Sequence, residues 1–166
     1  MGESIRLFPE CHADTALIRF LVKDEDLLRH SAGINEVAKN MQRSIQEFKK
    51  VVGIVDNDKH KPRYFRSFYK TDEKNRICYL HKPESNEYLI FIDKAIESFL
   101  LWNASEVNLA VTNYGFPTEV KPLGDMLKRI EIETDPNYLQ LLTELKNRNA
   151  PGFITLENIL NDFLTT

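Results

Sequence analysis

Long apolar runs and cysteine are both scarce in this 166-residue sequence. The longest apolar stretches, residues 88–92 and 98–102, fall far short of the roughly 20 residues that a membrane-spanning helix needs. The first residues, MGESIRLFPE, form no apolar signal segment, and two cysteines, Cys11 and Cys78, are too few for a secretory disulfide framework. We therefore expect a soluble, reduced, cytoplasmic protein with no membrane partner.

An excess of positive charge is also lacking. The formal net charge is -3 and the pI is about 5.8, so any contact with nucleic acid has to come from a local basic patch. The chain is 42% hydrophobic and 28% charged, which fits one globular domain over residues 1–166 with a core of its own.

Paired zinc ligands are missing as well. Cys78 and His81 are three residues apart on an expected strand, so their side chains would face opposite ways. We expect Cys78 to be a small buried apolar residue rather than a ligand.

Strand and helix patterns alternate along the first 103 residues. We expect strands at 5–8, 51–55, 76–80 and 87–92, and a further short strand within 27–35. Helices are expected at 15–22, with Asp14 as N-cap, at 34–50 and at 93–102. The second of these helices has one apolar stripe, formed by Val37, Met41, Ile45 and Phe48.

Segment 51–55, VVGIV, has the composition of a strand buried on both faces in a parallel sheet. After residue 104 the pattern indicates three amphipathic helices, at 119–130, 137–148 and 155–164. The prediction is an α/β fold with a mainly parallel, Rossmann-like sheet flanked by helices (1–103) and a helical C-terminal extension (104–166).

Acidic residues follow two of the expected strands. Glu10 ends the first strand, Asp14 comes four residues later, and Asp56 and Asp58 end strand 51–55. Ligands of open α/β sheets bind outside the carboxyl ends of the strands, so these carboxylates converge if the two strands are neighbours. Clustered carboxylates repel one another without a cation, and Mg²⁺ or Mn²⁺ suits such a site. The alternative is turn chemistry for Asp56 and Asp58 and plain helix capping for Asp14.

A basic and aromatic segment, KHKPRYFRSFY, follows the acidic pair at 59–69. Lys59, Lys61 and Arg63 could hold a phosphate or offset developing charge, as nucleic-acid-binding residues together with Arg66. The aromatic residues between these cations could stack on bases. The alternative is a solvated loop whose aromatic residues, Tyr64, Phe65, Phe68 and Tyr69, belong to the core or to a lid.

The segment PECHAD, two helices and then GIVDND resemble, in order and spacing, the Toprim fold of topoisomerases, bacterial primases and overcoming-lysogenization-defect nucleases. The resemblance covers about the first 100 residues. It implies that Glu10, Asp56 and Asp58 hold one catalytic Mg²⁺ for phosphodiester chemistry and that Asp14 is a candidate ligand of a second ion. In the nuclease branch a later glutamate assists the second ion, and AIESF around Glu97 is similar to that segment. We add Lys59 to the catalytic set, as the cation next to the acidic pair.

One position departs from the Toprim pattern. The glutamate is usually followed by glycine, whereas Cys11 follows Glu10 here, and a side chain there could narrow the approach of a phosphate backbone. The chain is also too short for a topoisomerase tyrosine domain, a primase zinc module or an ATPase domain. These features indicate a solitary Toprim-like domain.

Three functional hypotheses follow. The first is a Mg²⁺-dependent nuclease acting on DNA or RNA, with a partner protein that supplies DNA engagement or ATP hydrolysis. The second is a non-catalytic Toprim-like module that binds nucleic acid or protein, supported by the missing glycine. The third is a haloacid dehalogenase-like phosphatase with Asp56 as nucleophile, although that family usually has Thr or Val where this chain has His60.

Overall fold

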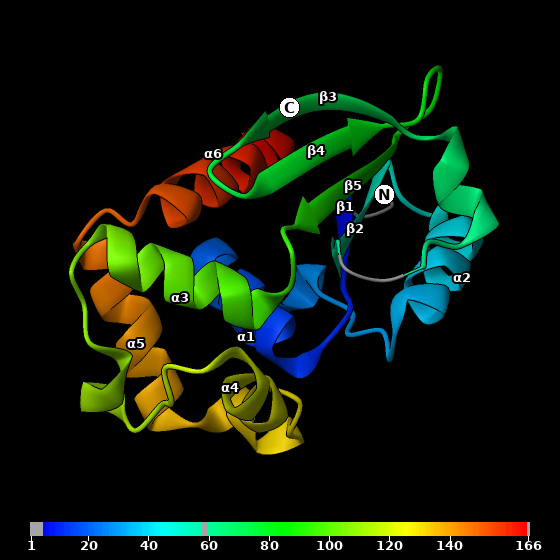
Figure 1. The fold of residues 1–166 in the computed structure, drawn as a ribbon. Coiled ribbons are helices and arrows are strands. Elements are labelled where there is room, and N and C mark those ends of the chain that lie inside the picture. The colour runs from blue at the N-terminus through cyan, green and yellow to red at the C-terminus, as the bar shows by residue number, and fades with distance from the viewer. Residues whose placement is uncertain (1–4, 58–59, 166) are drawn as a thin grey trace.

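A five-stranded sheet forms the centre of the computed structural model, which describes residues 5–57 and 60–165 (Figure 1). The strand order is β1-β2-β5-β4-β3. The parallel pairings join β1 (Ile5–Pro9), β2 (Lys50–Asp56) and β5 (Glu87–Ile92), and the antiparallel pairings join β5, β4 (Ile77–His81) and β3 (Tyr69–Lys74). The α/β class is as expected, but the sheet is mixed rather than mainly parallel.

Helices cover both faces of the sheet. The helices α1 (His12–Val22), α3 (Ile96–Glu106) and α6 (Pro151–Thr165) pack on one face, and α2 (Ile34–Ser44) lies on the other (Figure 1). Successive strand residues point to opposite faces, so Val52 and Ile54 of β2 join the first core and Val51 and Val55 join the second. This double burial explains the unbroken apolar run of β2.

Gly53 lets α2 approach β2 closely. A Cβ atom on Gly53 would lie 2.7 Å from Sδ of Met41 and 2.9 Å from Cγ1 of Val37, both on α2. Because real Cβ atoms do not come so close to their neighbours, a larger residue would push the helix away from the sheet.

Three local predictions about the first half need correction. Helix α1 begins at His12 with Cys11 as its N-cap, so Asp14 is a first-turn residue and not the cap. Helix α2 ends at Ser44, so Ile45 and Phe48 lie beyond the helix and do not belong to its apolar stripe. Strand β3, which the sequence did not suggest, has all six residues exposed.

The short strand expected within 27–35 is reduced to a single bridge. Leu28 pairs with Leu7 as an isolated parallel bridge, after a 3-10 turn at Glu25–Leu27. The backbone N–H groups of Arg29 and Ser31 then donate to the carbonyls of Leu7 and Pro9, each at 2.9 Å. This segment therefore runs along the outer edge of β1.

Three helices follow α3, as expected: α4 (Val120–Leu127), α5 (Pro136–Asn147) and α6. Two short 3-10 helices, Val111–Tyr114 and Ile130–Thr134, were not expected. The buried Asn103 of α3 accepts a hydrogen bond from the backbone N–H of Gly152 (2.8 Å), which ties α6 to α3. The division of the chain at residue 103 stays a prediction. No helix in the described ranges is long and apolar enough to cross a membrane.

Candidate metal site

Three acidic side chains meet at the carboxyl ends of β1 and β2. The two strands are parallel neighbours, with Pro9 opposite Ile54, so Glu10 and Asp56 emerge at the same edge of the sheet. Asp14 reaches this edge from the first turn of α1. Each of the three offers a carboxylate oxygen, and these atoms all lie within 4.8 Å of one another. The three residues are only 2%, 0% and 6% exposed, in the order Glu10, Asp14 and Asp56.

Backbone amides orient two of these carboxylates. The N–H of Asp56 donates to Oε2 of Glu10 at 3.0 Å, and the N–H of Ile96 donates to Oδ1 of Asp56 at 3.2 Å. Ile96 is the first residue of α3, so Asp56 satisfies one of the backbone donors at that helix terminus and benefits from the positive end of its dipole. The sheet and α3 therefore fix the carboxylates before any ligand binds.

Cys11 directly follows Glu10 and is the N-cap of α1. Its Sγ accepts a hydrogen bond from the backbone N–H of Asp14 at 3.4 Å. Burial raises the pKa of the Cys11 thiol well above its ordinary value, and the negative charges of Asp14 and Asp56 raise it further. The thiol is therefore protonated at neutral pH, chiefly because it is buried and secondarily because of the negative charges beside it.

Glu97 faces the same site from the first turn of α3. It lines a pocket of about 120 Å³ together with Cys11, Asp56, Leu127 at the end of α4, and Lys128, the C-cap of that helix. A Cβ on Gly124 of α4 would lie 3.2 Å from Oε1 of Glu97, so the glycine makes room for this carboxylate. Glu97 lies outside the group of three that has metal-ligand spacing among the described residues. It is placed beside the cluster, not in it.

Among the residues of the basic segment that the structure describes, none lines the pocket that holds Asp56. Asp58 and Lys59 lie outside the described residues. The ammonium of Lys61 lies 5.2 Å from the ring centroid of Phe91, and Arg63 and Arg66 are exposed on the 3-10 helix Arg63–Ser67. The structure therefore does not bring Lys61, Arg63 or Arg66 to the carboxylates.

The aromatic residues of this segment are divided between core and surface. Phe65 and Phe68 are buried in the core on the α2 side of the sheet, whereas Tyr69 is 65% exposed. The hydroxyl of Tyr64 donates to the buried carboxylate of Glu87. Burial is the main cause of the raised pKa of Tyr64, and this hydrogen bond raises it further. Phe65 and Phe68 are thus structural residues.

Comparison with known proteins found no match, whether against models of protein families, curated proteins or solved structures. The chemistry of the site has to be argued from its own side chains.

A polar network that the sequence did not reveal lies next to the cluster, at the N-terminal end of α1. Nδ1 of His12 lies 2.5 Å from Oε2 of Glu133, and Arg19 donates to Oε1 of Glu133 at 2.9 Å. On its other side the His12 ring stacks on the ring of His30, with centroids 4.3 Å apart. His12 and Glu133 are 121 residues apart, so no local sequence signal could have paired them.

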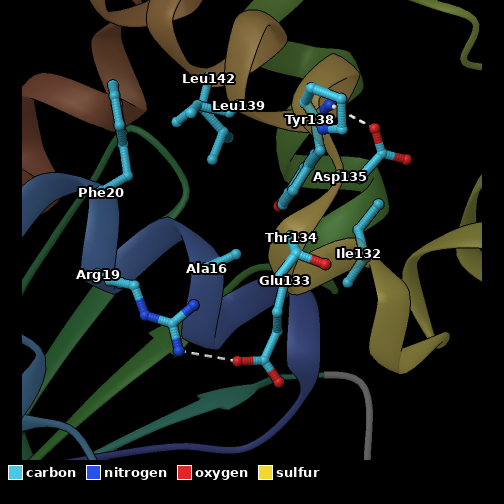
Figure 2. Close-up of a pocket in the computed structure, with 11 residues that line it drawn as sticks. Ala16, Arg19, Phe20, Ile132, Glu133, Thr134, Asp135, Tyr138, Leu139 and Leu142 are labelled. Carbon is cyan, nitrogen blue, oxygen red and sulfur yellow. Dashed lines mark hydrogen bonds and ion pairs between the residues drawn. The ribbon is translucent and has the colours of Figure 1, made fainter.

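This network belongs to the contact between α1 and the C-terminal helices. Figure 2 shows Arg19 reaching Glu133 at one side of a pocket of about 350 Å³ between α1, the 3-10 helix Ile130–Thr134 and α5. Nearby, the hydroxyl of the buried Tyr138 donates to the carbonyl of Ala13 at 3.1 Å. Burial raises the pKa of Glu133, but the hydrogen bonds from His12 and Arg19 outweigh it and lower that pKa overall. The C-terminal helices thus hold the turn of α1 that carries Asp14.

Proposed function

We propose that this chain binds Mg²⁺ or Mn²⁺ through Glu10, Asp14 and Asp56 and uses the ion to hydrolyse phosphodiester bonds in nucleic acid. In this proposal it is a nuclease built from a solitary Toprim-like domain. The observation that supports the proposal is the buried group of three carboxylates at the carboxyl ends of two parallel strands.

The donor set fits a hard divalent cation. Mg²⁺ and Mn²⁺ prefer carboxylate oxygens, and Mg²⁺ sites in enzymes keep coordination positions for water and substrate phosphate. Two full negative charges 4.8 Å apart repel by about 3.5 kcal/mol at an effective dielectric constant of about 20. A bound cation converts that repulsion into attraction, so a buried triad of this kind has a physical reason to bind one.

Each residue of the site has a role in this proposal. Glu10 and Asp56 hold the ion in orientations that the amides of Asp56 and Ile96 have already set. Glu97 lines the adjoining pocket, where it can accept a proton from the attacking water or assist a second ion. When bound, a divalent ion lowers the pKa of a coordinated water and polarises a phosphoryl oxygen.

The proposal also covers further ligands of the metal site, a nearby cation and the partners of the protein. We propose Asp14 as a ligand that the first or a second ion uses, Asp58 as a further ligand and Lys59 as a cation that offsets developing charge. The partners are DNA or RNA and a second protein that engages DNA or hydrolyses ATP. Both cysteines are free thiols, which suits a reducing compartment such as the cytoplasm.

A second candidate function is a Toprim-like binding module without catalysis. The side chain of Cys11 supports it, because Cys11 lines the same pocket as Asp56, and that pocket holds only about 120 Å³. The phosphatase with Asp56 as nucleophile ranks third, because Asp56 ends the second strand of the chain and its Oδ1 accepts the hydrogen bond from Ile96.

Calorimetric titration with Mg²⁺ and with Mn²⁺ tests the metal site directly. We expect saturable binding by the wild type, loss of binding in Asp56→Asn, and unchanged binding in Asp125→Asn, a matched change at an exposed aspartate of α4. The same proteins are then incubated with single- and double-stranded DNA and RNA in the metal that binds. Cleavage by the wild type but not by Asp56→Asn supports the nuclease. Metal binding without cleavage of any substrate supports the binding module. Equal metal binding by Asp56→Asn contradicts the metal site and with it the nuclease.

A further inference from the structure

A second charged pocket lies beside β1, on the outer edge of the sheet. It has a volume of about 370 Å³ and is formed by β1, the segment that follows the 3-10 turn Glu25–Leu27, and the C-terminal half of α2 with the turn after it. We call it the arginine pocket; its polar lining includes Arg6, Arg29, His30, Asn40, Arg43 and Glu47.

Positive charge predominates in the arginine pocket although the chain as a whole is acidic. Three arginines face one glutamate there, whereas the formal net charge of the chain is -3. Such a local excess attracts anions whatever the net charge of the molecule. Arginine also binds phosphate oxygens through two parallel hydrogen bonds, so the chemistry favours a phosphate group over a simple halide ion.

Part of the pocket is held in place by the protein itself. A guanidinium N–H of Arg6 donates to the carbonyl of Asp26 at 2.7 Å, and the guanidinium lies 4.6 Å from the ring centroid of Phe48. Arg29, in the segment after the 3-10 turn, and Arg43, on α2, are exposed to solvent and accessible to a ligand. The pocket thus combines one anchored arginine with two that can close on a bound group.

The arginine pocket and the acidic cluster lie along the same strand. The N–H of Arg29 donates to the carbonyl of Leu7, and β1 continues from Leu7 directly into Glu10. Three residues of strand span about 10 Å, so the part of β1 beside the arginine pocket lies about that far from Glu10. His30, next to Arg29, stacks on His12 beside the cluster, so the two sites adjoin through these rings.

We infer that the arginine pocket binds the phosphodiester backbone of a nucleic acid strand and fixes the register at which that strand crosses the acidic cluster. This inference rests on the proposed function. It places the main backbone contacts beside β1 and α2 and not on the basic segment at 59–66.

Fluorescence anisotropy with a labelled 12-nucleotide single strand, as DNA and as RNA, tests the inference. Binding is measured in Ca²⁺ over a series of salt concentrations. In the double variant Arg29→Ala/Arg43→Ala we expect the Kd to rise at least tenfold and the slope of log K against log salt to fall by about 1.4, since each lost phosphate contact removes about 0.7 for single strands. The matched variant Arg63→Ala/Arg66→Ala removes the same charge from another surface and should lose less.

The possible results separate this inference from the nuclease proposal. Equal losses in the two double variants, a larger loss in Arg63→Ala/Arg66→Ala, or no binding by the wild type would each overturn the inference, whether or not the protein cleaves nucleic acid in Mg²⁺. Binding that depends on Arg29 and Arg43 without cleavage in any metal supports the inference and overturns the nuclease. Circular dichroism melting of each variant confirms that it is folded, which the exposure of the four arginines leads us to expect.

Discussion

Replacing Asp14 by Asn removes one negative charge from the acidic cluster with almost no change in shape. A carboxylate oxygen of Asp14 lies within 4.8 Å of one from Glu10 and one from Asp56, and two full charges at that separation repel by about 3.5 kcal/mol or more at an effective dielectric constant of about 20. If the substitution relieves only a third of the repulsion within one pair, the gain is about 1 kcal/mol. A gain of that size raises the Tm of a chain of this length by about 2–4 °C. Without metal, Asp14→Asn should therefore melt at least about 2 °C above the wild type.

In divalent metal we expect the opposite order, with the wild type melting above Asp14→Asn. A ligand present at 100 times its Kd stabilises the folded state by about 2.7 kcal/mol, which corresponds to about 5–10 °C in Tm here. We expect the wild type to gain that much in Mg²⁺ and Asp14→Asn to gain little, because the variant has lost one of three ligands. The assay is differential scanning calorimetry in EDTA and in Mg²⁺, with the exposed Asp125→Asn on α4 as the control. An Asp14→Asn protein that melts below the wild type in EDTA, or gains as much from Mg²⁺, would refute the reasoning.

Three further predictions concern the surroundings of the site. Gly53→Ala should cost about 1–3 kcal/mol in urea unfolding, because its Cβ would lie 2.7 Å from Sδ of Met41; an unchanged midpoint would contradict the close packing of α2 on β2. Asp56→Ala should melt about 2–4 °C below Asp56→Asn, because only Asn keeps an acceptor for the N–H of Ile96, a cap worth about 1 kcal/mol; equal Tm values would show that this hydrogen bond does not stabilise α3. The pKa of Glu133 is lowered below its ordinary 4.5, so its stabilising contribution is complete above pH 4.5 and disappears as the pH falls through the lowered pKa. Thermal melts from about pH 7 to about pH 3 should show that Glu133→Gln lacks this part of the acid-induced loss of stability, and parallel curves for both proteins would contradict it.

The acidic site was predictable because it depends on local order along the chain. A strand, a turn with Glu10 and Asp14, and a second strand ending in Asp56 suffice once the two strands are parallel neighbours. The position of Asp14 was predicted only in part: it lies beside Glu10 and Asp56 as expected, but Cys11 and not Asp14 takes the capping position. Sequence spacing locates a side chain on an element, but the competition for a cap depends on the turn geometry.

Strand β3, which adds the second antiparallel pairing of the sheet, was not predictable from the same patterns. Strand β3 has no apolar face, so it shows no alternation of the kind that marks a half-buried strand. Its pairing with β4 depends on a two-residue turn in which Asn75 and Arg76 both have positive φ, 51° and 66°. Such hairpin turns usually have glycine as the second residue. Arg76 takes that position here, so the sequence lacks the Asn-Gly pair that would indicate a hairpin.

Long-range contacts around the site were hidden for a different reason. Glu133 pairs with His12 and Arg19, and Tyr138 with the backbone of Ala13, across more than 110 residues. No periodicity in a single sequence reports such a pairing. These contacts decide how firmly α1 is held, although they contribute no ligand.

The distance along the chain between Ala13 and Tyr138 also has a consequence for synthesis. On the ribosome, Glu10, Asp14 and Asp56 emerge before the two residues that hold α1, Glu133 and Tyr138. The acidic site therefore acquires its final geometry only after Glu133 and Tyr138 have left the ribosome, and a chain released without them would have the three carboxylates but not the contacts that hold α1.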